Sequence, residues 1–194
     1  MKDYSQGGEQ AAILSACEGI TGAFLDIGAF CATSLSNTRA LYELGWGGVM
    51  IDPSPGPIKG LLQEYGNDPR VKVVCAAVGL DRHIVKFRIT DDAVSTSEAG
   101  NEETWKTRGG FYGSLWVPEI TLAEIINQFG GFDFVNIDTE GTSVDLFAVL
   151  MATEMLPRCV CVEHDGRMIE VMRIANGRGY KMVLATGENA VFSR

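Results

Sequence analysis

Two carboxylates in the amino-terminal half follow short apolar segments in the manner of a nucleotide-binding site. Asp26 precedes Gly28 in segment 24–29 (FLDIGA), and Asp52 ends segment 49–52 (VMID). Ligands of open α/β sheets bind at the carboxyl ends of strands, where an acid after the second strand can accept hydrogen bonds from ribose hydroxyls. The full G-x-G-x-x-G pattern is missing, which argues against a pyrophosphate site. The pattern therefore favours a nucleoside ligand without a pyrophosphate, of which S-adenosylmethionine is the common one.

A second group of reactive side chains follows two later apolar segments. Asp138 and Glu140 lie in segment 137–141 (IDTEG), and Glu163 is followed directly by His164. A hydroxyl nucleophile has a high pKa and needs a base, and His164 or Asp138 could take that role. Alternatively, Asp138, Glu163 and His164 could hold a divalent metal that acidifies the hydroxyl; this ligand set suits manganese, iron or zinc better than magnesium. Glu140 is a third catalytic candidate, although the helix dipole also favours an acid in a first helical turn.

Apolar periodicity predicts that alternating strands and helices position these residues. The expected strands are 23–27, 48–51, 71–78, 132–137 and 158–163, and the expected helices are 8–18, 36–44, 57–65, 121–129, 143–150 and 168–177. Thr121 and Glu124 have the spacing of a capping box. Segments 180–185 and 190–193 are expected to form a terminal hairpin. The pattern predicts an α/β fold with a mostly parallel, doubly wound sheet and an antiparallel carboxy-terminal hairpin, in a single domain spanning residues 1–194.

Segment 90–118 interrupts this alternation. It is polar and glycine-rich, and it contains four large aromatic residues, Trp105, Phe111, Tyr112 and Trp116. A long segment without regular structure is either disordered or functional. Because disordered segments seldom carry so many large aromatics, we expect a lid or substrate-recognition loop over residues 90–118.

Composition limits the classes of partner and the compartment. A formal net charge of −9 over 194 residues argues against binding to nucleic acid and to anionic membranes. No apolar run is long enough to span a bilayer, and residues 1–9 lack a signal-peptide pattern. Cys75, Cys159 and Cys161 lie in apolar runs and are expected to be buried, reduced thiols. A cytoplasmic location follows as an expectation.

Several short motifs together resemble the FkbM family of S-adenosylmethionine-dependent methyltransferases. In chain order they are 5–9 (SQGGE), 25–29 (LDIGA), 36–38 (SNT), 44–49 (LGWGGV), 52–55 (DPSP), 76–79 (AAVG), 95–96 (ST), 137–141 (IDTEG), 162–164 (VEH) and a hairpin containing Asn189. The resemblance covers nearly the whole chain. One departure is 30–32 (FCA), where the family usually has Asn-Asp-Gly or a similar sequence. The resemblance implies a Rossmann-like class I methyltransferase fold with a reversed last strand.

The resemblance also implies roles for individual residues. The residues expected to bind the cofactor are Asp26, Gly28, Ala29, Phe30, Asn37, Asp52, Pro53, Ser54, Ala76, Ala77 and Asp138. Asp52 would hold both ribose hydroxyls, although an Asp-Pro turn is its structural alternative. Ala76 and Ala77 would admit the adenine ring at the end of the third strand, or simply pack tightly in the core. Gln6 and Glu9 could close over the cofactor, or could form a solvated helix start.

The expected activity is therefore methyl transfer, most plainly to a hydroxyl of a small molecule, a sugar or a glycan. Two other functions stay open at this point. The departure at 30–32 would suit a protein that binds the nucleoside without catalysing transfer, whereas a nicotinamide-dependent oxidoreductase is disfavoured by the missing glycines. Because no separate substrate domain is visible, a second copy of the chain could complete the acceptor pocket as a homo-oligomer.

Overall fold

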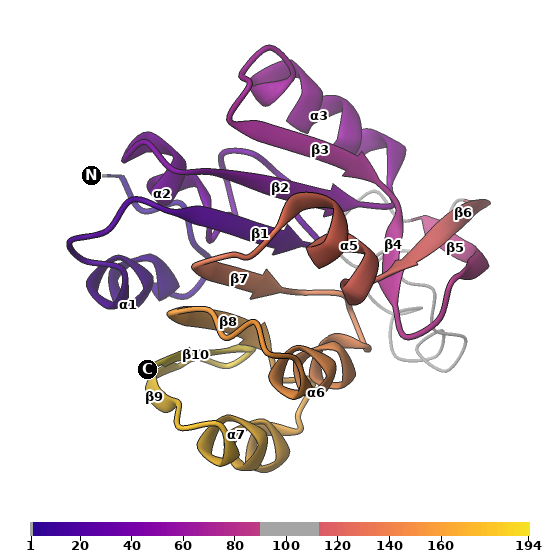
Figure 1. Ribbon diagram of the computed structural model, residues 1–194. Helices are drawn as coiled ribbons and strands as arrows, with labels where there is room; N and C mark the ends of the chain where they lie inside the picture. Colours follow the sequence, from indigo (N-terminus) through magenta and orange to yellow (C-terminus); the bar gives the residue numbers. More distant parts are fainter. Residues whose placement is uncertain (1, 90–112) are drawn as a thin grey trace.

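A twisted central sheet is the framework of the protein (Figure 1). The computed structural model describes residues 2–89 and 113–194, and within them the sheet has seven strands in the order β3-β2-β1-β7-β8-β10-β9. The strands are β1 (Ala23–Ile27), β2 (Gly47–Asp52), β3 (Val71–Cys75), β7 (Phe134–Ile137), β8 (Cys159–Glu163), β9 (Lys181–Ala185) and β10 (Asn189–Ser193). The first five pair in parallel, while β10 is antiparallel to both β8 and β9. The predicted doubly wound sheet and its terminal hairpin are confirmed.

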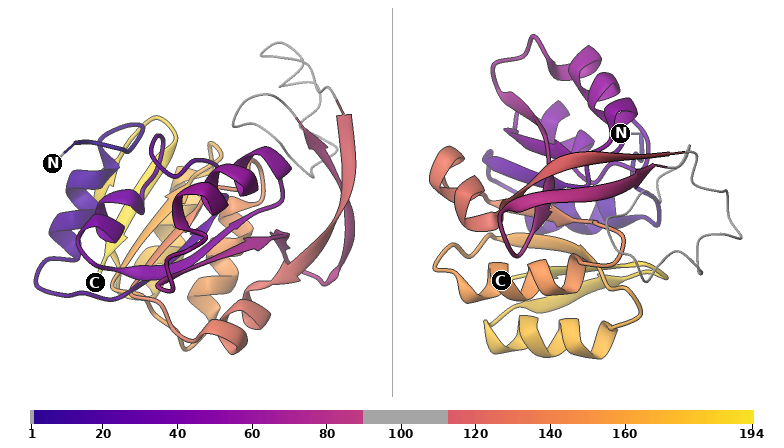
Figure 2. Two further views of the ribbon diagram at one scale, coloured as in Figure 1. Left: turned by 90° about the horizontal axis from the view of Figure 1, so that it is seen from above. Right: turned by 90° about the vertical axis from the view of Figure 1, so that its right-hand side faces the viewer.

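Helices cover both faces of this sheet (Figure 2). They are α1 (Glu9–Ala16), α2 (Arg39–Glu43), α3 (Pro55–Tyr65), α5 (Leu122–Phe129), α6 (Ser143–Ala152) and α7 (Met168–Gly177). Successive strand side chains point to opposite faces, so each strand serves two cores. Phe24 packs with residues of α1, α2 and α3. Leu25, the next residue of β1, packs with residues of α5, α6 and α7.

Local sequence explains where individual helices begin. At α5 the Thr121 hydroxyl accepts a hydrogen bond from the Glu124 backbone N–H, and the Glu124 carboxylate accepts one from the Thr121 backbone N–H. The predicted capping box is thus confirmed. The helix expected over 36–44 is shorter and starts at Arg39. Ser36 lies outside it because its backbone N–H bonds to the Tyr4 carbonyl, while its hydroxyl accepts from the Arg39 N–H.

A second, three-stranded sheet corrects the predicted loop. It contains β4 (Ala77–Gly79), β5 (His83–Ile89) and β6 (Gly113–Thr121), in the order β4-β6-β5. Residues 113–118 therefore belong to a strand and not to a loop, and β6 is antiparallel to β5. Pro118 hid this strand, because proline inside an apolar run argues against a strand. Three of the aromatic residues predicted for the lid, Trp105, Phe111 and Tyr112, lie outside the described residues.

The small sheet stands beyond the carboxyl ends of the central strands (Figures 1 and 2). Its inner side packs Phe87 and Val117 against Ala77, whereas Trp116 on its outer side is 69% exposed. The strand expected over 71–78 is accordingly divided, since β3 ends at Cys75 and β4 starts at Ala77 in the other sheet. The expected burial of Cys75 is wrong, because this residue ends the edge strand of the central sheet and is exposed. In the described part of the chain, no helix has the length and apolar character needed to cross a membrane.

Candidate active site

Strand register brings the predicted site residues into one row. Ile27 of β1 pairs with Ile137 of β7, which pairs with Val162 of β8. The next residues along these three strands are therefore Gly28, Asp138 and Glu163, side by side at the carboxyl edge. Because parallel strands end at the same edge, the acids predicted from separate segments do meet. The row continues into β10, where Asn189 pairs with Glu163.

Gly28 lets the backbone after β1 turn tightly at this edge. Its φ is 81°, and a Cβ at this position would lie 1.7 Å from the Asp138 carbonyl oxygen. The backbone N–H groups of Gly28 and Ala29 both donate to the Ile51 carbonyl, at 2.9 and 3.1 Å. A side chain at residue 28 would be excluded by both conformation and space. The turn is thus held between the ends of β2 and β7.

Asp52 fixes the same turn from the end of β2. Its carboxylate accepts hydrogen bonds from the backbone N–H of Phe30 at 3.1 Å and of Ser54 at 2.7 Å. The side chain is 6% exposed, and burial raises the pKa of Asp52 to about 6, against the lowering effect of these two bonds. Asp52 thus joins the predicted ribose site to the turn that follows Gly28.

Asp26 lies deeper, in a buried polar network. Its two carboxylate oxygens accept hydrogen bonds from the Thr38 hydroxyl at 2.5 Å and from the Asn136 amide at 2.9 Å. The Asn37 side-chain amide in turn donates to Asn136 Oδ1 at 2.9 Å. Burial raises the pKa of Asp26, while the bonds from Thr38 and Asn136 lower it. Asp26 therefore anchors the loop after β1 through protein donors. Within the part of the chain that the structure describes, the buried Asn37 Oδ1 has no hydrogen-bond partner.

The remaining predicted cofactor residues continue from Asp52 towards the small sheet. Pro53 links Asp52 to Ser54, the buried residue immediately before α3. Ala76 donates its backbone N–H to the Asp52 carbonyl at 3.3 Å. Ala76 and Ala77 are both buried, so they border the site between the two sheets with small side chains.

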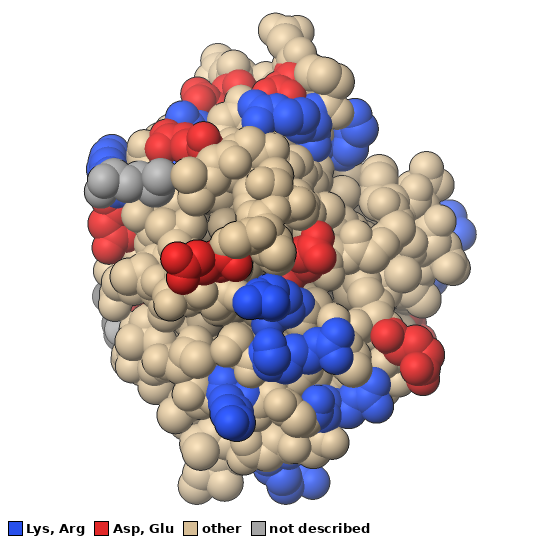
Figure 3. Space-filling view, turned by 60° about the vertical axis from the view of Figure 1, so that its left-hand side comes forward, with Lys and Arg blue, Asp and Glu red and all other residues tan. Residues whose placement is uncertain are grey.

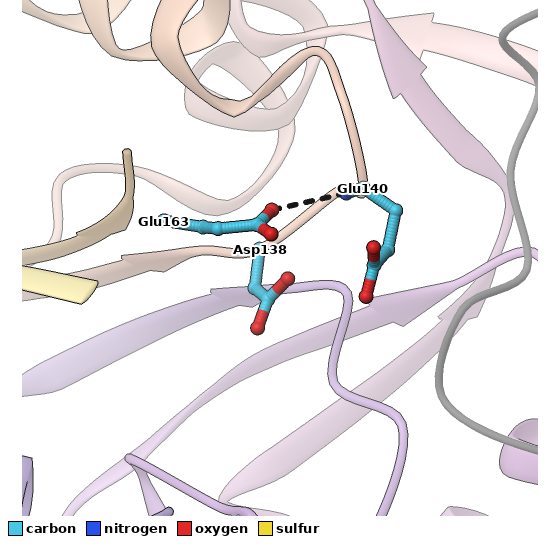
Figure 4. Close-up of side chains that lie close together, drawn as sticks. All are labelled: Asp138, Glu140 and Glu163. Atoms are coloured by element: carbon cyan, nitrogen blue, oxygen red, sulfur yellow. Dashed lines mark hydrogen bonds between the residues drawn. The ribbon is translucent and has the colours of Figure 1, made fainter. Parts of the chain in front are cut away.

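The carboxylates that follow β7 and β8 form a compact cluster (Figure 4). One oxygen each of Asp138, Glu140 and Glu163 lie within 4.8 Å of one another. Burial and then the Glu140 charge raise the pKa of Asp138 to about 7. Burial and then the Asp138 charge raise the pKa of Glu163 to about 9. The cluster therefore binds protons at neutral pH, because three carboxylates so close together cannot all ionise freely.

Glu163 also holds the loop that carries the other two acids. Its Oε2 accepts hydrogen bonds from the Glu140 backbone N–H at 3.3 Å, drawn as the dashed line in Figure 4, and from the Ser143 hydroxyl at 3.1 Å. The Ser143 hydroxyl accepts from the Thr139 backbone N–H at 2.9 Å. One carboxylate of β8 thus organises the turn between β7 and α6.

His164 does not join this cluster. Its Nδ1 accepts a hydrogen bond from the Gly166 backbone N–H at 3.2 Å, and its own backbone N–H bonds to the Glu188 carbonyl at 2.9 Å. Among the described residues, the acids that could share an ion are Asp138, Glu140 and Glu163. The structure therefore groups Asp138 and Glu163 of the predicted ligand set with Glu140, while one imidazole nitrogen of His164 is engaged in a local turn.

Backbone strain marks the loops around the site. Phe30, Glu140 and Asp165 have φ of 34°, 53° and 48°, and they follow β1, β7 and β8 in turn. Side chains other than glycine rarely adopt this left-handed conformation, and such residues gather at functional sites. The backbone N–H of Phe30 donates a hydrogen bond to the Asp52 carboxylate, and that of Glu140 donates one to the Glu163 carboxylate. These bonds stabilise the two strained backbone conformations.

Gln6 and Glu9 of the amino-terminal segment contact the carboxy-terminal hairpin, which the sequence did not predict. Glu9 is 1% exposed and so is not part of a solvated helix start. Its Oε1 accepts hydrogen bonds from the Asn189 amide at 3.0 Å and the Thr186 hydroxyl at 3.3 Å. Gln6 donates to Glu188 in the same hairpin. No sequence signal paired these segments, because the contact joins residues at the two ends of the described chain.

The fold and this edge define a class of protein. The strand order, with its antiparallel β10, is that of class I methyltransferases. The family model described as the methyltransferase FkbM domain matches residues 26–181. The chain belongs to the FkbM methyltransferase family.

Solved structures resemble this chain in fold but have low sequence identity to it. A crystal structure of methyltransferase FkbM from Methylobacillus flagellatus KT has a TM-score of 0.56 and 14% identity, covering 90% of this chain and 44% of that one. The chain thus spans less than half of that structure's length. SAH-bound methyltransferase PaMTH1 from Podospora anserina has a TM-score of 0.47 and 13% identity, covering 93% of this chain and 75% of that one. No curated protein matches the sequence significantly.

Proposed function

We propose that the protein is an S-adenosylmethionine-dependent methyltransferase that acts on a hydroxyl of a sugar, a glycan or a small metabolite. The observation that carries the proposal is the shared edge at which Gly28, Asp52 and Asp138 follow three neighbouring strands of an FkbM-family fold. The acceptor class derives from the family resemblance.

The residues present fit the cofactor. Each Asp52 oxygen accepts one backbone hydrogen bond and retains capacity for a ribose hydroxyl. The absence of a side chain at Gly28 leaves the turn compact, and Asn37 Oδ1 remains open to a donor. When bound, the cofactor supplies a methyl group that its sulfonium already activates. The protein then needs only to position the acceptor and remove its proton.

Asp138 is the base that the geometry supports best. It stands in the row between Gly28 and Glu163, and its pKa of about 7 suits proton removal at neutral pH. Glu140 beside it raises that pKa by its charge. His164 is the alternative base, since only its Nδ1 is engaged in the local turn. An ion held by the carboxylates is a rival means of acidifying the hydroxyl.

Calorimetric titration of S-adenosylhomocysteine tests the cofactor. We expect micromolar affinity for the wild type, about −8 kcal/mol. Asp52→Ala should weaken binding roughly 100-fold, because it removes two charge-assisted hydrogen bonds. Glu154→Ala, at an exposed residue after α6, is the matched control and should leave affinity unchanged. A wild type that fails to bind would contradict the proposal, and repeating the titration with EDTA tests the rival ion.

A non-catalytic cofactor-binding protein is the second candidate. It is favoured by Phe30, which stands with Cys31 and Ala32 where the family usually has Asn-Asp-Gly, and which adopts a strained φ of 34°. Transfer of a labelled methyl group to a panel of glycans and hydroxylated metabolites separates the candidates. Tight cofactor binding without methyl transfer, together with an affinity that Asp138→Asn leaves unchanged, would favour the non-catalytic binding protein.

A further inference from the structure

Two buried thiols meet at the edge of the sheet opposite the acid cluster. Cys17 follows the last residue of α1, and Cys159 is the first residue of β8. Both side chains are buried in the same hydrophobic cluster. Next to them, the Arg158 Nε donates to the Ala16 carbonyl at 2.6 Å, which holds the preceding residues of both segments together. This contact joins segments that lie far apart in the sequence.

The environment of the pair suits thiol chemistry. Interaction with the Cys159 thiol, and then the Arg158 charge, lower the pKa of Cys17, whereas the same interaction and burial raise the pKa of Cys159. Lys and Arg side chains gather on the lower half of the face in Figure 3, which brings the α1 side forward. A nearby cation favours the thiolate, which is the reactive form of cysteine.

A hollow lies next to the residues that precede the two cysteines. Its volume is about 380 Å³, and its lining includes Ala16 and Arg158, the immediate predecessors of Cys17 and Cys159. Cys17 is 4% exposed, whereas Cys159 is fully buried. Cys17 is therefore the thiol that an oxidant would reach first, and Cys159 is placed to attack it afterwards.

We infer that Cys17 and Cys159 are a redox-reactive pair that forms an intramolecular disulfide when a hydroperoxide oxidises the protein. The Cys17 thiolate attacks a peroxide oxygen, so that an S–O bond forms, the O–O bond breaks and, after protonation, water leaves from hydrogen peroxide or an alcohol from an organic hydroperoxide. The Cys159 sulfur then attacks Cys17, forming the S–S bond as the S–O bond breaks and water leaves. The two sulfurs together lose two electrons, which reduce the peroxide.

The disulfide would attach α1 covalently to the sheet. Only Glu9, Gln10 and Ile13 of this helix are buried, so its non-covalent docking is thin. At its other end, α1 presents Glu9 to the hairpin beside the acid row. Oxidation would therefore fix the helix that carries this contact. The inference is independent of methyl transfer.

Peptide mapping after exposure to stoichiometric hydrogen peroxide tests the link. With free thiols blocked by N-ethylmaleimide, trypsin should release peptide 3–39 joined to peptide 159–167, two hydrogens lighter than their sum. The same peptides contain Cys31 and Cys161, so variants must assign the pair. Cys31→Ser and Cys161→Ser should retain the link, whereas Cys17→Ser and Cys159→Ser should abolish it.

Two further readouts keep the inference falsifiable. In Cys159→Ser the oxidation should stop at a sulfenic acid on Cys17, trapped by dimedone. Oxidised wild type should unfold at a higher temperature than reduced wild type, and Cys17→Ser should show no such difference. A link that persists in Cys17→Ser, or that forms only in denatured protein, would overturn the inference, as would oxidation of the folded protein without any link.

Discussion

The carboxyl edge of the central sheet has two halves, the ends of β1 and β2 and the ends of β7 and β8, and their acidic side chains have different surroundings. At β1 and β2, each oxygen of Asp26 and Asp52 accepts a hydrogen bond from a protein donor. At β7 and β8, burial and the Glu140 charge raise the pKa of Asp138, although its contact with Glu163 lowers it, and burial and the Asp138 charge raise the pKa of Glu163. The first half shapes the backbone, whereas the second half stores protons and also holds its own loop through the bonds that Glu163 accepts. Acids thus serve structure in both halves, and proton storage is added where other acids surround them.

The largest effect should come from Gly28→Ala, which attacks the structural half. The new Cβ would overlap the Asp138 carbonyl oxygen in a backbone of positive φ, so we expect a loss of about 3–5 kcal/mol in unfolding free energy. Urea denaturation measures it. Gly60→Ala, in the interior of α3 with open space around it, is the control and should stabilise by about 0.5–1 kcal/mol. Equal changes in unfolding free energy for Gly28→Ala and Gly60→Ala would show that the close contact between residue 28 and the Asp138 carbonyl oxygen does not matter for stability.

Asp26→Ala should have the next largest effect. It leaves the Thr38 hydroxyl and the Asn136 amide without their buried acceptor, at about 2–4 kcal/mol. Glu140→Ala, in the acid cluster, should not destabilise and should lower the pKa of Asp138 by removing a like charge. Unfolding in urea compares the two variants. The distinction between the halves fails if Glu140→Ala costs as much as Asp26→Ala.

The smallest effect concerns pH. The folded-state pKa values of Glu163 and Asp138, about 9 and about 7, exceed the ordinary values near 4.5 and 3.8. The folded state therefore binds more protons than the unfolded state, and this contribution to stability is lost as pH rises from about 4 through 9. Glu163→Gln removes the largest share, so its stability should decline less with pH than that of the wild type. Denaturation midpoints of the wild type and of Glu163→Gln are measured at pH 5, 7 and 9. If the acid cluster stores no protons, the midpoints of the two proteins will fall equally with pH.

Sequence patterns predicted the framework because it depends on local periodicity. The apolar runs of β1, β7 and β8 and the capping box at Thr121 were legible without tertiary information, and strand ends of a parallel sheet meet by geometry alone. Three features could not be predicted in this way. Strand β6 was missed because it contains Pro118. A local turn fixes one imidazole nitrogen of His164, and the partner of Glu9 is distant in the sequence. Each depends on long-range packing that no short segment records.

The bond between Glu9 and Asn189 has a consequence for how the chain matures. The two residues are separated by 180 positions, and the hairpin that presents Asn189 is among the last parts of the described chain to be synthesised. Domains generally form from the amino terminus onward during synthesis. Within the described chain α1 precedes the hairpin, and although Glu9 Oε2 already accepts from the Gly7 backbone N–H, Oε1 must wait for the hairpin to gain its donors. This early helix is therefore among the last elements of the described chain to be secured.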